Sequence, residues 1–125
     1  MTEPQSGTRI DFRDGKLVVP DDPTIPFIEG DGTGPDIWRA TKYVLDGTVD
    51  KIYGGKKKFH WYEVLAGDKA FAATGEYLPQ DTLDAIRDYR VPIKGPLSPP
   101  VGGHLPSLNH TPRPGPADLP AARAL

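Results

Sequence analysis

The chain has 125 residues, no cysteine, and a net charge of −2 from 15 basic and 17 acidic side chains. A chain of this length supports one domain with a modest core, and its nearly balanced charge gives no reason to expect nucleic acid as a partner. The missing cysteines exclude a disulfide framework and a thiolate metal site, and no apolar run approaches the ~18 residues of a membrane span. We therefore expect a soluble, cytoplasmic protein that binds neither nucleic acid nor membrane.

The first part of the chain predicts short extended segments. Residues 7–20 contain two short runs around Asp14-Gly15, a dipeptide typical of hairpin turns. A brief apolar strand is expected at Thr24–Ile28, and it leads into the glycine-rich segment EGDGTG, residues 29–34.

A long helix is predicted from Pro35 to the stop at Gly54-Gly55. Proline suits the first turn of a helix, where the N–H that it lacks would have no partner within the helix. Gly47 costs this helix about 1 kcal/mol relative to alanine, but an apolar periodicity outweighs that cost. Apolar side chains recur at spacings of three, four and seven residues and predict one buried stripe: Ile37, Trp38, Thr41, Val44, Leu45, Val49 and Ile52.

A second strand, a second helix and a third strand are expected in the next part of the chain. Residues 59–67, FHWYEVLAG, are rich in aromatic and branched side chains and predict a strand followed by a polar loop. Pro79 then opens a helix with Ile86 facing the core. The last strand begins at residues 91–96, VPIKGP, where Pro92 would remove one donor from the sheet. This alternation of strands and helices predicts an α/β fold with a mainly parallel sheet.

The composition changes near residue 100. Nine of the 15 prolines lie from Pro92 to Pro120, and no aromatic residue follows Tyr89. A segment of this kind has little apolar surface to bury. We therefore assign residues 1–103 to a folded part and expect residues 104–125 to be an irregular, disordered tail rich in proline and alanine.

The glycine-rich segment 29–34 is a candidate phosphate loop, since it lies between a predicted strand and a predicted helix. A dinucleotide loop with Gly30 and Gly32 would need a third glycine where this chain has Pro35. The spacing therefore favours a structural turn. The three histidines at positions 60, 104 and 110 share no ligand spacing, so no metal site is expected among them.

The segment 94–109 combines a lysine, hydroxyl groups, adjacent glycines and an amide. It leaves the carboxyl end of a predicted parallel strand, where open α/β sheets bind ligands. Two interpretations remain open on these residues alone: a binding loop for an anionic small molecule, or an ordinary connection rich in turns.

Three blocks carry a resemblance to a known family. They are IPFIEGDGTGPDIW at 25–38, GEYLPQDTLDAIRDYRVPIKGPL at 75–97, and PVGG at 100–103 followed by SLN at 107–109. In order and spacing they closely resemble the N-terminal part of bacterial NADP-dependent isocitrate dehydrogenases, within the isocitrate/isopropylmalate dehydrogenase family. The resemblance implies an α/β enzyme with a large and a small domain, in which residues 1–103 are the N-terminal portion of the large domain and the intact enzyme is a homodimer.

The resemblance also implies an activity. Enzymes of this kind oxidise isocitrate to 2-oxoglutarate in the tricarboxylic acid cycle, passing a hydride to NADP and releasing carbon dioxide, while Mg or Mn polarises the substrate oxygen. Relatives that act on isopropylmalate or homoisocitrate are the alternative within the family. They usually lack the W-x-E-x-x-x-G block present here at residues 61–67, so isocitrate is favoured.

Site residues follow from the same resemblance, position by position. Lys94 is expected to give electrostatic support near the site, and Ser98 to contact the cofactor. The side chains expected to bind the substrate carboxylates are Ser107, Asn109, Arg113 and Arg123. No metal ligand is expected in this chain, because the family's metal-binding aspartates lie further along its sequence.

The resemblance weakens after Gly103. Where the family has GGGIRSLN this chain has GGHLPSLN, and four further prolines forbid the helical turn and the strand that the family places between its two arginines. Loss of two bases from codons for Gly-Gly-Ile (GGG GGC ATC) would leave GGG CAT, which encodes Gly-His, so an out-of-frame tail is our first hypothesis. The 125-residue chain would then be a truncated and inactive form. The alternative is a short binding domain without catalytic activity.

Overall fold

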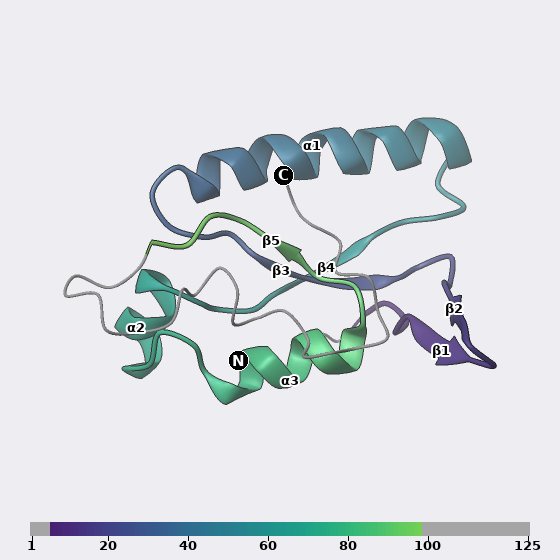
Figure 1. Ribbon diagram of the computed structural model, residues 1–125. Coiled ribbons are helices and arrows are strands. Elements are labelled where there is room, and N and C mark those ends of the chain that lie inside the picture. The colour runs from purple at the N-terminus through teal and green to yellow at the C-terminus, as the bar shows by residue number, and fades with distance from the viewer. Residues whose placement is uncertain (1–5, 99–125) are drawn as a thin grey trace.

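The computed structural model describes residues 6–98, and its centre is a parallel three-stranded sheet with strand order β4-β3-β5 (Figure 1). The middle strand β3 (Thr24–Ile28) pairs with β4 (His60–Glu63) on one side and with β5 (Ile93–Lys94) on the other. The predicted α/β class with a mainly parallel sheet is confirmed. The predicted strand at 59–67 is shorter than expected, since only its first part pairs with β3.

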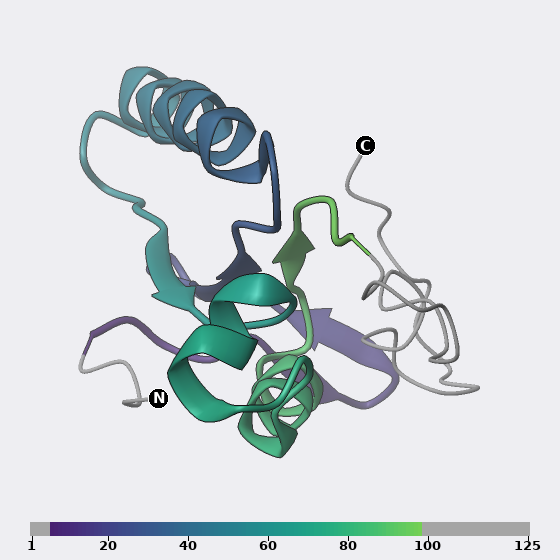
Figure 2. The same cartoon turned by 90° about the vertical axis from the view of Figure 1, so that its left-hand side faces the viewer.

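Helices cover both faces of this sheet. The connection from β3 to β4 is α1 (Gly34–Tyr53), and the connection from β4 to β5 contains α2 (Asp68–Thr74) and α3 (Gln80–Tyr89). Figures 1 and 2 show α1 on one face of the sheet and α3, with α2 beside it, on the other. No helix within residues 6–98 is long and apolar enough to span a membrane.

The expectation of a polar loop after β4 was wrong, because α2 lies there. Gly67 and Gly75 flank this helix with positive φ angles of 78° and 82°, and Ala70 is fully buried. The stacked rings of Phe71 and Tyr77 add a contact, with centroids 4.5 Å apart. A helix of seven residues is too short to show an apolar period, so its formation depends on this packing.

The predicted hairpin near the beginning of the chain is confirmed. Strands β1 (Asp11–Arg13) and β2 (Lys16–Val18) pair antiparallel in a sheet of their own. Asp14 and Gly15 turn the chain with φ angles of 52° and 77°, a combination that Asp-Gly supplies at low cost.

The main core lies between the sheet and α3. Its buried residues are Ile28, Tyr62, Val64, Ala66, Ala85, Ile86, Tyr89 and Leu97. Thr82 of α3 is also fully buried and donates a hydrogen bond of 2.5 Å from its hydroxyl to the carbonyl of Leu65. A polar group buried with a partner costs little, so this bond fixes α3 against the strand end without weakening the core.

Aromatic side chains make the contact between the sheet and α1. Trp38 stacks on Phe27 of β3 at 4.2 Å between ring centroids, and it meets the ring of Trp61 edge-on at 4.9 Å. The indole N–H of Trp61 donates to the carboxylate of Asp46 at 2.9 Å. These contacts attach α1 to the sheet.

The predicted helix at Pro35–Gly54 is confirmed, but the prediction that its whole apolar stripe is buried was wrong. Trp38 is buried, whereas Ile37, Val44 and Ile52 are 48%, 61% and 66% exposed. The remaining members of the stripe are half-buried. Periodicity identified a helix with one apolar face correctly, but it could not show how much of that face would be covered.

The prolines in and near the strands lie where the missing backbone N–H costs the sheet few hydrogen bonds. Pro26 lies inside β3, and β5 pairs only with Phe27 and Ile28, so Pro26 has one neighbouring strand. Pro92 was expected inside the last strand, but β5 begins after it at Ile93. The predicted tail at 104–125 lies outside the described residues, as does the boundary at residue 103.

Candidate functional site

Two loops leave the same edge of the sheet. The chain continues from β3 into Glu29 and from β5 into Gly95, and both strands run parallel. The carboxyl ends of parallel strands are where open α/β sheets bind ligands. The candidate site is therefore this edge, formed by residues 29–34 and 94–98.

The two loops approach each other so closely that their backbones hydrogen-bond. The N–H of Gly95 donates to the carbonyl of Ile28 at 2.8 Å, and the N–H of Asp31 donates to the carbonyl of Pro96 at 2.7 Å. Gly30 has a φ of 88°, and a Cβ at this position would overlap the carbonyl of Pro96. This glycine is therefore required by close backbone packing, which supports the interpretation of 29–34 as a structural turn.

Asp31 connects three segments of the chain. It is 9% exposed, and its carboxylate accepts hydrogen bonds from the backbone N–H of Asp68 at 3.0 Å and of Ser98 at 2.9 Å. Gly67 lies against the same carboxylate, where a Cβ would come within 2.6 Å. Sequence reasoning missed this role. The available signal was an acidic residue between two glycines in a strand-to-helix loop, a place where acceptors of backbone N–H groups are common.

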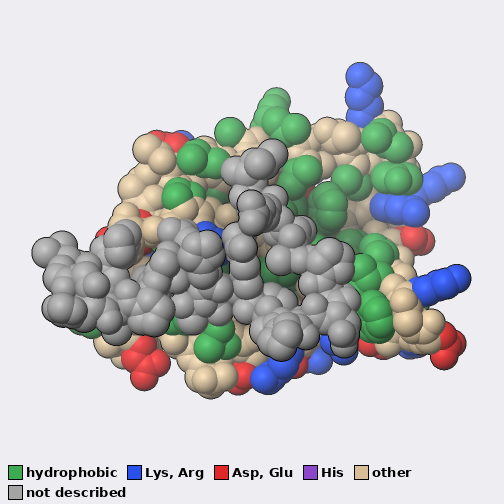
Figure 3. Space-filling model, viewed as in Figure 1, with side chains coloured by type: hydrophobic (Ala, Val, Ile, Leu, Met, Phe, Trp, Pro, Cys, Tyr) green, Lys and Arg blue, Asp and Glu red, His purple; other side chains and the backbone are tan. Residues whose placement is uncertain are grey.

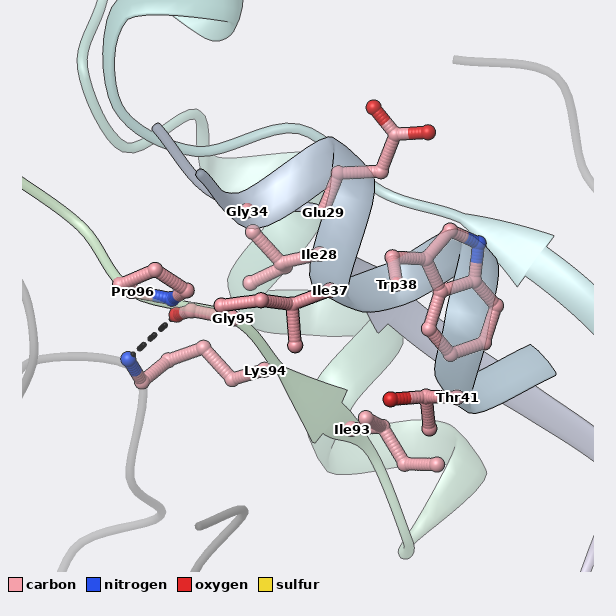
Figure 4. A pocket seen from close by; sticks show the side chains of 10 residues that line it. All are labelled: Ile28, Glu29, Gly34, Ile37, Trp38, Thr41, Ile93, Lys94, Gly95 and Pro96. Carbon is pink, nitrogen blue, oxygen red and sulfur yellow. Dashed lines mark hydrogen bonds between the residues drawn. The ribbon is translucent and has the colours of Figure 1, made fainter. Parts of the chain in front are cut away.

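A cleft of about 490 Å³ lies beside these loops, between α1 and β5 (Figure 4). Its walls are mainly apolar, and Ile37, Trp38 and Ile93 contribute most of the large side chains. Lys94 also lines the cleft and is half-buried, with its ammonium donating to the carbonyl of Gly95 at 2.9 Å. Glu29 points away from the cleft in Figure 4. The cleft thus has apolar walls and a cation at the end of a strand.

An ion-pair group lies on the outer side of the same edge. The ammonium of Lys69 is 2.6 Å from the carboxylate of Glu63 and 3.4 Å from that of Glu29. The hydrogen bond to Glu63, helped by the charges of both carboxylates, raises the pKa of Lys69 above its usual 10.5. Because the Lys69 side chain is half exposed, the pairing is screened by water and links α2 to the strand ends only weakly.

Lys94 and Ser98, predicted from the sequence, both lie at this edge within four residues of each other. Ser98 is exposed, and its backbone N–H is already bound to Asp31. The other predicted site residues, Ser107, Asn109, Arg113 and Arg123, lie outside the described residues.

Metal ligands do not gather within residues 6–98, where no three His, Cys, Asp or Glu side chains are close enough to hold an ion. His60 is instead half-buried at the start of β4, with Nδ1 3.2 Å from the hydroxyl of Ser6. The described residues therefore do not form a site for a divalent metal by themselves.

A parallel sheet with helices on both faces and a cleft at its strand ends is typical of doubly wound α/β proteins. Comparison with known families is more specific. The family model described as isocitrate/isopropylmalate dehydrogenase matches residues 24–113, and the chain belongs to this family. The match includes Lys94, Ser98, Ser107, Asn109 and Arg113 and ends before Arg123.

Individual relatives agree with the family. The chain is 58% identical to an NADP isocitrate dehydrogenase of Nostoc sp. over 111 residues, covering 87% of this chain and 24% of that protein. It is also 58% identical to the corresponding Staphylococcus aureus enzyme over 93 residues, covering 74% and 22%. The chain thus spans about a quarter of the length of the curated relatives it matches.

A solved structure shows the same fold. Isocitrate dehydrogenase from Methylococcus capsulatus superposes with a TM-score of 0.62 at 39% identity, covering 72% of this chain and 24% of that one. The predicted partial isocitrate dehydrogenase-like fold is therefore confirmed.

Proposed function

We propose that this chain is the N-terminal portion of an enzyme that oxidises isocitrate to 2-oxoglutarate with NADP and releases carbon dioxide. The observation that carries the proposal is the 58% identity, over 87% and 74% of the chain, to two proteins named NADP isocitrate dehydrogenase. In the same proposal the intact enzyme is a cytoplasmic homodimer of the tricarboxylic acid cycle. Residues 1–103 belong to its large domain and residues 104–125 form a separate tail.

Lys94 contributes positive charge in this proposal. Its ammonium lies at the end of β5 on the wall of the cleft, and isocitrate carries three carboxylates. In a cleft with apolar walls, water screens a cation less than it does in open solvent. Lys94 therefore stabilises the bound anion without transferring a proton.

Ser98 is proposed to contact the cofactor NADP. The bond from its backbone N–H to Asp31 holds the residue at the strand edge and leaves the side chain exposed. NADP, when bound, accepts the hydride from the substrate, and the role of Ser98 is to orient it. Substrate carboxylates are assigned to residues outside the described part: Ser107, Asn109, Arg113 and Arg123.

Mg or Mn, the metal of the proposed reaction, would stabilise negative charge on the substrate oxygen when bound. The acids and histidines of residues 6–98 do not converge on one point. The proposal therefore places the metal ligands in parts of the intact enzyme other than residues 6–98, and no described residue is given a role in binding it.

A hybrid enzyme tests the proposal. Residues 8–103 replace the aligned segment of the Nostoc enzyme, and formation of NADPH is measured with isocitrate and, separately, with isopropylmalate and homoisocitrate. We expect turnover with isocitrate alone; turnover only with one of the other two substrates would reject the proposal. In this hybrid Lys94→Met should lower kcat/KM for isocitrate about tenfold or more, as expected for loss of a charged contact. The control is Lys56→Met on an exposed loop, which should leave kcat/KM unchanged.

The 125-residue polypeptide by itself is expected to form no NADPH from isocitrate. It spans about a quarter of the relatives' length, and the metal ligands of the proposed reaction are assigned elsewhere. The measurement is absorbance of NADPH with the purified polypeptide, isocitrate, NADP and Mg or Mn. Measurable turnover would contradict the assignment of the metal ligands to other parts of the enzyme. It would also contradict the proposal that this chain carries only part of the active site.

We also infer that the chain is read out of frame from about residue 104. The family match to residue 113 and the retained register of SLN at 107–109 argue against a single shift, so the hypothesis requires a second change that restores the register there. Sequencing the DNA that encodes residues 100–125 and the bases beyond tests this. An alternative frame that restores GGGIRSLN and continues the family sequence is expected, and its absence would reject the hypothesis.

A further inference from the structure

Asp31 holds the segment 95–98 at two points. Its backbone N–H donates to the carbonyl of Pro96 at 2.7 Å, and its carboxylate oxygen Oδ2 accepts the backbone N–H of Ser98 at 2.9 Å. Leu97, between these two residues, is 4% exposed and belongs to the main core. The backbone on either side of this buried side chain is therefore bonded to one residue, Asp31, which sets the position of Ser98 relative to the sheet.

The Asp31 carboxylate has little room to move. Its other oxygen, Oδ1, accepts the backbone N–H of Asp68 at 3.0 Å, and the backbone carbonyl of Asp31 accepts the N–H of Gly34 at 2.9 Å. Gly67 lies so close that a Cβ there would be 2.6 Å from Oδ2. A rotation of the side chain would break the bonds to Asp68 and Ser98 together. A carboxylate with partners on both oxygens is a rigid support for a neighbouring residue.

The cleft beside this segment is lined mainly by apolar side chains. Ile37, Trp38 and Ile93 contribute most of the large ones, and Figure 3 shows hydrophobic side chains gathered along α1 and on the surface beneath it. Apolar contacts limit where a backbone can lie, but they do not fix the direction of an N–H group, which requires an acceptor. For Ser98 that acceptor is the carboxylate of Asp31.

We propose that Asp31 is a positioning residue for NADP and acts through Ser98. By holding the backbone N–H of Ser98, its carboxylate places the Ser98 hydroxyl where the cofactor is contacted, and Asp31 itself does not touch the cofactor. A displacement of about 1 Å is enough to weaken such a contact strongly. The inference rests on the proposed function, from which it takes the contact between Ser98 and NADP, and it adds the residue that supports this contact.

Binding of NADPH to the hybrid enzyme tests the inference and needs no turnover. The hybrid carries residues 8–103 in the Nostoc enzyme, and its dissociation constant for NADPH is measured by fluorescence titration. Asp31→Asn keeps one acceptor oxygen for two donors and should raise the dissociation constant about threefold to tenfold, the range expected for one lost hydrogen bond. Asp31→Ala removes both acceptor oxygens and should raise it further.

A double-variant cycle shows whether Asp31 acts through Ser98. Ser98→Ala removes the hydroxyl but keeps the backbone N–H that bonds to Asp31, and it should weaken NADPH binding by itself. Adding Asp31→Asn to Ser98→Ala should then change the dissociation constant less than about twofold, because the group that Asp31 positions is already gone. Two effects on one contact are not additive, whereas a general loss of stability would add to the effect of Ser98→Ala.

Thr82→Val is the matched control for a loss of stability. The Thr82 hydroxyl donates to the carbonyl of Leu65, so this variant also loses a hydrogen bond of a buried side chain, but one in which neither Asp31 nor Ser98 takes part. It should leave the dissociation constant for NADPH within about twofold of the original value. Urea unfolding shows whether this variant and Asp31→Asn are both folded under the conditions of the titration.

Three results would overturn the inference. They are equal affinity for NADPH in the original hybrid and in Asp31→Asn, an Asp31→Asn effect that persists in full with Ser98→Ala, and an equal loss of affinity in Thr82→Val. A hybrid that binds no NADPH would contradict the cofactor assignment and the inference together. A hybrid that shows the expected binding pattern but oxidises no isocitrate would contradict the proposed activity and leave the role of Asp31 standing.

Discussion

The two faces of the parallel sheet differ in how completely they are covered. On the α3 face, Ile86 and Tyr89 pack with the strands in a core whose members are all buried. On the α1 face, the aromatic cluster around Trp38 contacts the sheet, while Ile37, Val44 and Ile52 remain exposed. The sequence predicted α1 from an apolar periodicity and α3 from Pro79 at its start, with Ile86 facing the core. The difference shows that an amphipathic pattern identifies a face to be covered, but not the segment that covers it.

The largest effect expected from this comparison comes from one substitution made on each face. Ile86→Ala should lower the free energy of unfolding by about 2–4 kcal/mol, because Ile86 is 4% exposed in the core and its loss leaves a cavity. Ile52→Ala removes the same atoms from a side chain that is 66% exposed, and the change should stay within about 0.5 kcal/mol. Urea unfolding of both variants, followed by tryptophan fluorescence, measures the difference. Equal losses would show that the faces are equally covered.

Asp31→Asn tests the connection between the loops at the sheet edge. The amide oxygen can still accept one backbone N–H, but the amide NH₂ cannot accept the other, so Asp68 or Ser98 loses its partner. Because both donors belong to residues that are themselves exposed, losing one of these hydrogen bonds should cost about 0.5–1.5 kcal/mol. The matched control is Asp50→Asn on the exposed side of α1.

Amide hydrogen exchange provides the more specific measurement for Asp31. Exchange at the N–H of Asp68 or Ser98 should become faster in Asp31→Asn, relative to that of Thr24 in β3. A variant as stable as the original chain, with unchanged exchange at both positions, would show that Asp31 does not hold the loops together.

Lys69 gives the smallest predicted effect, and it depends on pH. Because the pKa of Lys69 is raised in the folded chain, chiefly by Glu63, its contribution to stability is fully present below about pH 10.5 and is lost as the pH rises above that value. Lys69→Met should therefore lower the free energy of unfolding by about 0.2–1 kcal/mol near pH 7, since the pair is half exposed. Lys56→Met is the control for loss of one surface charge.

Two conditions should abolish the Lys69 effect. The difference between the original chain and Lys69→Met should shrink above pH 10.5, where the ammonium deprotonates, and also in about 1 M salt, where the Debye length falls to about 3 Å. A difference that persists in both conditions would mean that the aliphatic part of Lys69, and not its charge, links α2 to the strand ends.

Much of the fold could be predicted from local patterns. The hairpin followed from Asp14-Gly15, and the beginning of α1 from Pro35. The strand Thr24–Ile28 was predicted with its observed bounds. These features depend on backbone preferences of a few neighbouring residues, which the sequence displays directly. The helix α2 was not predicted from the sequence. Gly67 and Ala70 indicate a helix there only when their tertiary contacts are known.

The candidate site was predicted only in part. Lys94 and Ser98 were predicted by resemblance; both lie at the strand edge, and their roles stay predictions. The role of Asp31 was missed, because its two partners lie 37 and 67 residues further along the chain. No local pattern reports a hydrogen bond over such a separation.

The sequence alone determined the family, the order of strands and helices, and the glycines that permit the loops to turn. It did so because these depend on residue identity and short-range spacing, and because several blocks keep their order over most of the chain. Tertiary structure decided that Gly30 is required by the backbone of Pro96, that Asp31 joins three segments, and that one side of α1 remains uncovered. These properties depend on which distant segments of the chain contact one another. The burial of a side chain depends on all of its tertiary contacts and not on a local sequence pattern.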